Sequence, residues 1–82
     1  MRVRRDPDRA AAKGNAIAQN RLARLLVAGR GVPANKVDAA AWHILAAAQG
    51  LADPWLDDAL KDMSAEDRKR AEKLAAERLG MR

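Results

Sequence analysis

Cysteine, tyrosine, phenylalanine and threonine are absent from this chain of 82 residues, and histidine and serine occur once each, as His43 and Ser64. The lack of cysteine excludes disulfides, thiolate metal sites and thiol chemistry. Because the usual covalent nucleophiles are almost missing, the composition argues against an enzyme. We therefore expect no catalytic residue, no metal and no cofactor.

Large apolar side chains are also scarce: 20 residues are Ala, and only 20 others are Val, Ile, Leu, Met or Trp. Ala favours helices, whereas strands favour the β-branched and aromatic residues that are rare here. No run of about 18 apolar residues exists, so no membrane span is predicted. The basic N-terminus is not followed by an apolar stretch, so no secretory signal is visible and a cytoplasmic protein is expected.

Helix start and stop signals divide the chain into short segments. Asp6-Pro7 and Asp53-Pro54 are typical of a capping residue followed by proline at the first helical position. Asn35 with Asp38, and Ser64 with Asp67, resemble capping pairs. Gly14, Gly29 and Gly50 end the first three of the expected helices. The expected helices span residues 8–13, 16–28, 36–49, 53–62 and 64–79.

Equivalent helix stops recur along the chain. Gly14 and Gly50 stand 36 residues apart, and Lys13-Gly14-Asn15-Ala16 is similar to Gln49-Gly50-Leu51-Ala52. A spacing of this size is typical of helix-hairpin solenoids. The many small Ala residues allow stacked helices to approach closely. The pattern predicts an all-α fold, a short α-solenoid of antiparallel helix hairpins.

These residues resemble one repeat of a known family. The matching positions are Ala12-Lys13-Gly14-Asn15-Ala16-Ile17-Ala18-Gln19, Leu22, Gly29-Arg30-Gly31-Val32, Ala39, Trp42, Ala46-Ala47 and Gly50, which look like a Sel-one-like repeat (SLR), a tetratricopeptide-type hairpin. The resemblance implies a single domain over residues 1–82, with a full repeat at 12–50, a half repeat at 51–62 and a capping helix at 64–79. It also implies a noncatalytic adaptor or scaffold in bacterial signalling or complex assembly. Ala23, Leu26 and His43 depart from the family pattern, which usually has Gly, Tyr and an aromatic there.

Four residues are candidates for contacting a protein partner. Asn20, Arg24 and Val27 share the less apolar face of the helix expected at 16–28. Trp55 is the fourth, because tryptophan is enriched at binding hot spots. Its large apolar ring favours the other interpretation, in which Trp55 fills the gap between its own helix and the final helix.

Other residues whose side chains could take part in catalysis or ligand binding are interpreted as structural. His43 has no His or Glu at i±4, which indicates a packing residue at a repeat junction. Gly29-x-Gly31 lacks the other residues of a phosphate loop and is interpreted as a turn. Four acidic residues form a cluster that offers too few oxygens for a calcium site. They are interpreted instead as acids that complement the helix dipole at helix starts. They are Asp53, Asp57, Asp58 and Asp62.

The net charge of +5 is unevenly distributed. Residues 1–36 carry nine Lys or Arg and two acids, giving +7, whereas residues 37–82 carry seven and nine, giving −2. The electrostatic field of the basic residues attracts an acidic protein surface or nucleic acid. Two Trp residues, however, offer little surface for base stacking. The sequence therefore predicts a small adaptor or accessory subunit that docks on a larger protein assembly, with a basic nucleic-acid-associated protein as the alternative. One repeat is fewer than the three or so that solenoids need, so stabilisation by a partner or by self-association is expected.

Overall fold

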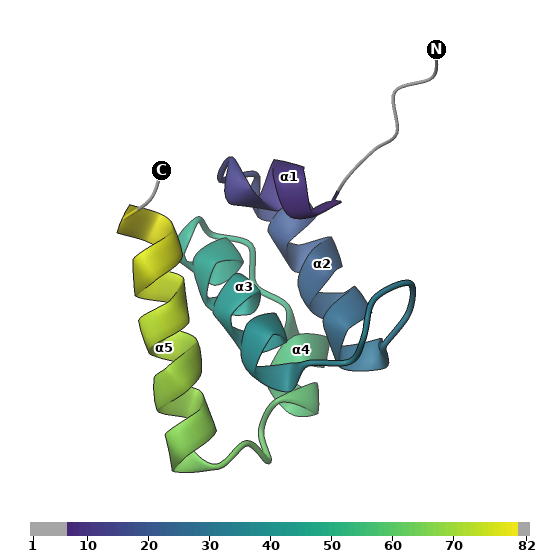
Figure 1. Ribbon diagram of the computed structural model, residues 1–82, viewed down its shortest axis with the longest axis vertical. Coiled ribbons are helices and arrows are strands. Elements are labelled where there is room, and N and C mark those ends of the chain that lie inside the picture. Colours follow the sequence, from purple (N-terminus) through teal and green to yellow (C-terminus); the bar gives the residue numbers. More distant parts are fainter. Residues whose placement is uncertain (1–6, 81–82) are drawn as a thin grey trace.

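The computed structural model describes residues 7–80, and over this range the chain forms five helices and no strand. They are α1 (Pro7–Ala12), α2 (Ala16–Ala28), α3 (Lys36–Ala48), α4 (Pro54–Ala59) and α5 (Ala65–Gly80), shown in Figure 1. The prediction of an all-α fold is confirmed. The observed bounds lie within one residue of those predicted, except that α4 ends at Ala59 and gives way to a turn before Asp62. The predicted cap Asp6 lies outside the described residues.

Side chains at four helix starts satisfy backbone amides that have no partner within the helix. Each accepts a hydrogen bond from the amide three residues later, which is the usual capping geometry. The four bonds are Ala18 N to Asn15 (3.0 Å), Asp38 N to Asn35 (3.0 Å), Leu56 N to Asp53 (3.2 Å) and Asp67 N to Ser64 (3.1 Å). The caps predicted at Asn35 and Ser64 are confirmed.

Gly29 ends α2 in the left-handed backbone region, with φ at 68°. Its amide donates to the Leu25 carbonyl at 2.8 Å, and the next amide, that of Arg30, donates to the same oxygen at 3.1 Å. A Cβ atom at Gly29 would lie 3.3 Å from the Cβ of Ala34. The left-handed backbone conformation therefore favours glycine here, and a Cβ atom would add a tight contact with Ala34.

Replacing Gly29 with alanine is expected to lower the free energy of unfolding by about 1–2 kcal/mol, because an L-residue is strained at this φ. Urea unfolding followed by circular dichroism measures the loss. Gly80→Ala is the matched control, since Gly80 is helical and an added Cβ would meet nothing within 4 Å. Equal stability changes for the two variants would contradict the expectation.

Helix α3 is the central element, with α2 packed on one side and α5 on the other (Figure 1). The pair α2 and α3 is antiparallel: the Leu26 carbonyl near the end of α2 accepts from Asn35 at the start of α3. At the other end of the pair, Gln49 donates to Gln19 at 2.8 Å. The core consists of a few large side chains set among many alanines. The large side chains are Leu22, Leu26, Trp42, Leu45, Leu56 and Leu60.

Gln19 is the one fully buried polar side chain among the described residues. Its amide nitrogen donates to the Ala11 carbonyl at 3.1 Å, and its oxygen accepts from Gln49. Both ends of the side chain are thus hydrogen-bonded, as burial requires. Through Gln19, α1, α2 and the end of α3 are joined by one polar chain.

Trp42 connects α3 to α5. The residue is 7% exposed and is the largest side chain of the core. The guanidinium of Arg78 lies over the ring, 4.1 Å from its centroid, and also pairs with Asp38. Because α5 otherwise buries mainly the small side chains Ala71 and Ala75 on this side, Arg78 supplies both packing and charge at the contact.

Candidate functional site

The most concentrated polar contact joins α2 to the start of α4. Arg24 donates two hydrogen bonds to the carboxylate of Asp53, from Nε at 2.7 Å and from Nη2 at 2.9 Å. Asn20, one turn earlier on α2, donates to the same carboxylate at 2.7 Å. Since Asp53 also caps α4, its two oxygens together accept four hydrogen bonds. The carboxylate is almost completely buried, with 4% of the residue exposed.

These contacts shift the ionisation of both partners. Hydrogen bonds from Arg24 hold the pKa of Asp53 well below its ordinary value; burial opposes this shift, whereas Asn20 and the amide of Leu56 add to it. The same hydrogen bond raises the pKa of Arg24, against the effect of its own desolvation. The pair is therefore ionised at neutral pH, and its bidentate geometry sets where α4 starts relative to α2.

Trp55 lies beside this contact. The Arg24 guanidinium lies over its ring, 4.8 Å from the centroid, and the residue is 49% exposed. The Arg24 side chain is itself 49% exposed. Trp55 therefore packs against α2 while much of its ring remains open to solvent. The alternative expected from sequence, burial in a gap against the final helix, does not describe a half-exposed ring.

The structure brings three of the four sequence-predicted contact residues together. Asn20, Arg24 and Trp55 meet around Asp53, whereas Val27 is partly buried against the core cluster. Asp53 itself was expected only as a helix start. Its neighbour Pro54 indicated that Asp53 caps a helix. No local signal indicated its partners Arg24 and Asn20, which lie 29 and 33 residues away in the sequence.

His43 has a partner that its own helix did not reveal. Its Nε2 lies 2.7 Å from the Asp57 carboxylate of α4. Because a carboxylate only accepts, Nε2 carries the proton in this contact. The other ring nitrogen, Nδ1, is buried and has no hydrogen-bond partner. The His43 side chain is mostly buried, with 12% exposed, and it makes a polar contact to α4 that the sequence did not predict.

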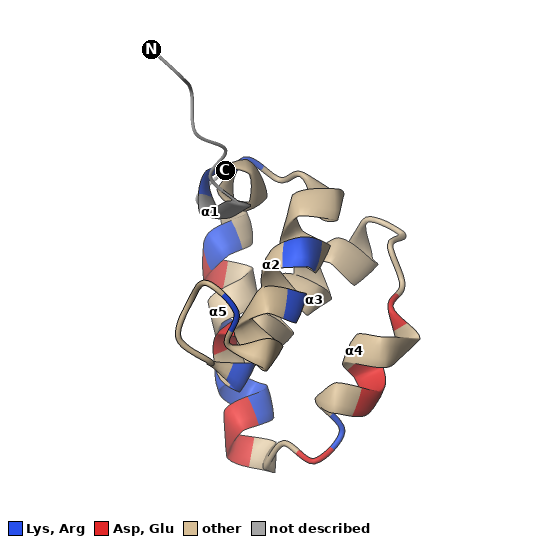
Figure 2. Ribbon diagram, turned by 90° about the vertical axis from the view of Figure 1, so that its right-hand side faces the viewer, with Lys and Arg blue, Asp and Glu red and all other residues tan. Residues whose placement is uncertain are grey.

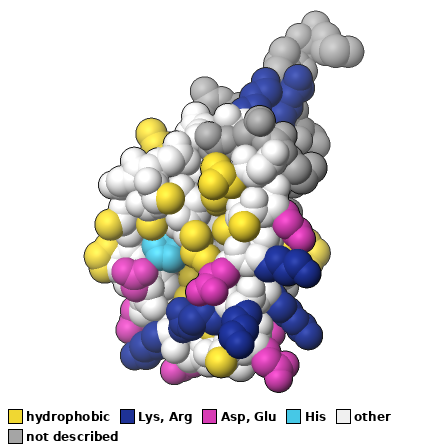
Figure 3. Space-filling view, turned by 90° about the vertical axis from the view of Figure 1, so that its left-hand side faces the viewer, with side chains coloured by type: hydrophobic (Ala, Val, Ile, Leu, Met, Phe, Trp, Pro, Cys, Tyr) yellow, Lys and Arg dark blue, Asp and Glu magenta, His cyan; other side chains and the backbone are white. Residues whose placement is uncertain are grey.

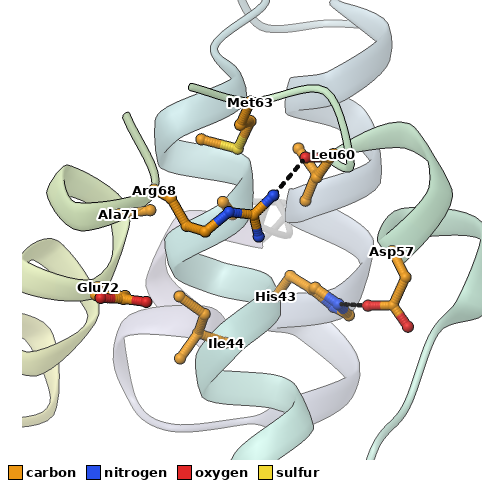
Figure 4. A pocket seen from close by; sticks show the side chains of 9 residues that line it. His43, Ile44, Asp57, Leu60, Met63, Arg68, Ala71 and Glu72 are labelled. Carbon is orange, nitrogen blue, oxygen red and sulfur yellow. Dashed lines mark hydrogen bonds and ion pairs between the residues drawn. The ribbon is translucent and has the colours of Figure 1, made fainter. Parts of the chain in front are cut away.

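A small pocket of about 150 Å³ lies beside His43, between α3, α4 and α5 (Figure 4). Its walls combine apolar side chains such as Ile44 and Met63 with Asp57, Arg68 and Glu72. Figure 3 shows the histidine on this face among hydrophobic and acidic side chains. The volume is about half the lower limit of roughly 300 Å³ for ordinary ligand sites.

The acidic cluster expected at Asp53–Asp62 is divided among separate partners. Asp53 pairs with Arg24, Asp57 with His43, and Asp58 with Lys61 at 3.1 Å. Within residues 7–80, no three His, Cys, Asp or Glu side chains come together as a group that could hold a metal ion. None of the described helices has the length and apolar character needed to cross a membrane.

Charge is distributed differently on the neighbouring helices. Figure 2 shows that α2 carries basic and no acidic residues, whereas α4 carries acidic ones. The only ion pair between these two helices is Arg24 with Asp53 at the start of α4. Among residues 9–80, this pair is therefore the electrostatic connection between the basic and acidic helices.

Compared with protein-family models, with curated proteins and with solved structures, the chain matches none. The resemblance to the SLR family remains a prediction from sequence.

Proposed function

We propose that this protein is a noncatalytic protein-interaction module, a small adaptor or accessory subunit that docks on a larger assembly. The observation that carries the proposal is the exposed Trp55 ring held against Arg24. Tryptophan and arginine are the residues most enriched at binding hot spots. Because Arg24 is anchored by Asp53, the ring is held in place before any partner binds, which lowers the ordering cost of binding.

The arrangement of helices supports the finer proposal of a short α-solenoid. An antiparallel hairpin, α2 and α3, is followed by the short α4 and by α5, which covers the second side of α3. In such proteins each repeat contacts mainly its neighbours and leaves an extended binding face. The proposed binding face consists of the exposed side of α2 and the start of α4.

Replacing Trp55 with alanine is expected to remove partners from the tagged full-length chain in affinity purification followed by mass spectrometry. The physical reason is the loss of a large, pre-positioned apolar contact. Leu79→Ala on α5 is the matched control, because Leu79 is similarly exposed at 55% and lies on another helix. If Trp55→Ala and Leu79→Ala purify with the same partners as the unchanged chain, the proposed function is wrong.

A parallel measurement on Arg24→Ala separates binding from folding. This variant removes the anchor of Trp55 and also leaves the buried Asp53 carboxylate with fewer donors. A thermal melt therefore accompanies the purification. Loss of partners with an unchanged melting temperature supports a binding role, and a lowered melting temperature assigns the loss to folding.

A further inference from the structure

One continuous part of the chain carries positive charge only. From Arg9 to Val37 the sequence contains no Asp or Glu. Its basic residues are all exposed; they are Arg9, Lys13, Arg21, Arg24, Arg30 and Lys36. Within residues 9–80, Arg24 is the only one of these six that pairs with a carboxylate. The surface around α2 is therefore basic and largely uncompensated.

Exposed apolar groups lie within this basic surface. Ile17 on α2 is 63% exposed, and Trp55 is 49% exposed. Successive steps of four and three residues place Ile17, Arg21 and Arg24 next to one another on one face of α2. Trp55 continues this row, since it lies against Arg24. We call the row Ile17, Arg21, Arg24 and Trp55 the basic stripe.

The two arginines of the basic stripe differ in role. The charge of Arg24 is balanced by Asp53, so Arg24 is a positioning residue for Trp55. Arg21 is exposed and, within residues 9–80, has no acidic partner. The stripe thus presents an apolar group at each end and an available cation between them.

We propose that the basic stripe binds an acidic segment of a partner protein, with apolar side chains of that segment against Ile17 and Trp55 and a carboxylate against Arg21. This inference rests on the proposed function and adds the chemistry of the partner. Complementary charge speeds association and excludes basic competitors, while the apolar contacts supply most of the affinity.

The same observations favour a polypeptide over nucleic acid and over a second copy. Nucleic-acid binding uses aromatic faces for base stacking, but Arg24 occupies one face of Trp55, and aliphatic Ile17 offers no stacking surface. The acids of α4, Asp57 and Asp58, already contact His43 and Lys61, so a second copy would have to disrupt these contacts in order to offer them. A separate acidic segment leaves these internal contacts intact.

A random peptide library displayed on phage and selected on the immobilised full chain tests the inference. We expect the enriched peptides to contain more Asp and Glu than the starting library, together with at least one large apolar residue. Isothermal titration of an enriched peptide is then expected to show weaker binding at higher salt, because exposed charges are screened.

Two pairs of variants locate the binding. Arg21→Glu is expected to weaken the binding of the selected peptide by about tenfold or more, because it places like charges together. Lys69→Glu, an exposed charge reversal on α5, is its control and is expected to have no effect. Ile17→Ser is expected to weaken peptide binding, whereas Leu79→Ser on α5 is expected to leave peptide binding unchanged. None of the four residues is buried, so all four variants are expected to fold.

Several outcomes would overturn the inference while leaving the proposed function intact. One is that the enriched peptides show no excess of acidic residues. The same holds if no enriched peptide depends on Ile17 and Arg21 for binding. Another is binding of duplex DNA that Arg21→Glu abolishes and Trp55→Ala leaves unchanged, which would assign the stripe to nucleic acid. A dimer that Arg21→Glu dissociates would assign the stripe to a second copy. The proposed function fails separately, if Trp55→Ala retains every co-purifying protein.

Discussion

Replacing Trp42 with alanine is expected to leave much of the chain unfolded at 37 °C. Burial of Trp42 is nearly complete, and removing a buried tryptophan typically costs about 3–5 kcal/mol. Marginal stabilities of about 0.05–0.15 kcal/mol per residue make this a large share of what a chain this short has. The variant also removes the ring under Arg78, and with it part of the contact between α3 and α5.

Far-UV circular dichroism and urea unfolding at 25 °C measure the effect. Trp55→Ala is the matched control, because the same substitution at a half-exposed site is expected to cost about 1 kcal/mol or less. Trp42→Phe is expected to fall between Trp42→Ala and the unchanged chain, since an aromatic ring would remain beneath Arg78. Equal losses at Trp42 and Trp55 would show that the core is not organised around Trp42.

Replacing Asp53 with asparagine is expected to lower the free energy of unfolding by about 1–2 kcal/mol at neutral pH. Asparagine is as good a helix cap as aspartate, so the bond from the Leu56 amide is retained while the charge pairing is lost. Arg24 is half exposed and regains water, which keeps the loss below that of stranding a buried charge.

The pH dependence of this loss has a definite sign. Because the pKa of Asp53 is lowered in the folded state, its carboxylate stabilises the fold above the ordinary aspartate pKa of about 4. That stabilisation is lost progressively as pH falls below about 4. The difference between the unchanged chain and Asp53→Asn is therefore expected to shrink on acidification, although both become less stable.

Urea unfolding at a series of pH values between neutral and about 2.5 measures this difference. Asp58→Asn is the matched control on the same helix: its pair with Lys61 is exposed, and such pairs contribute little. Its stability curve is expected to run close to that of the unchanged chain at every pH. A constant difference between Asp53→Asn and the unchanged chain would contradict the ionisation shift assigned to Asp53.

Helix positions were predictable because their signals are local. Asn35 and Ser64 each act on an amide three residues away, and Gly29 acts through its own backbone. Such signals need no knowledge of the rest of the fold. The end of α4 was less predictable, since no glycine follows it and its last residues form a turn.

The candidate site was predictable only in part. Asn20 and Arg24 were chosen because they share a helix face, and Trp55 because of its residue type. Their common partner Asp53 and the pair of His43 with Asp57 depend on how α4 packs against α2 and α3. A search along one helix cannot detect partners supplied by another.

The buried Gln19 bears on how α2 and α3 are aligned lengthwise. The buried faces of α2 and α3 combine alanines with Leu22, Leu26, Trp42 and Leu45, whose packing favours one alignment. A slip of α2 along α3 by one helical turn, about 5.4 Å, would separate Gln19 from Gln49 and leave the buried Gln19 oxygen without its donor. The hydrogen bond between Gln49 and Gln19 thus penalises misaligned hairpins and adds to apolar packing in selecting a single register.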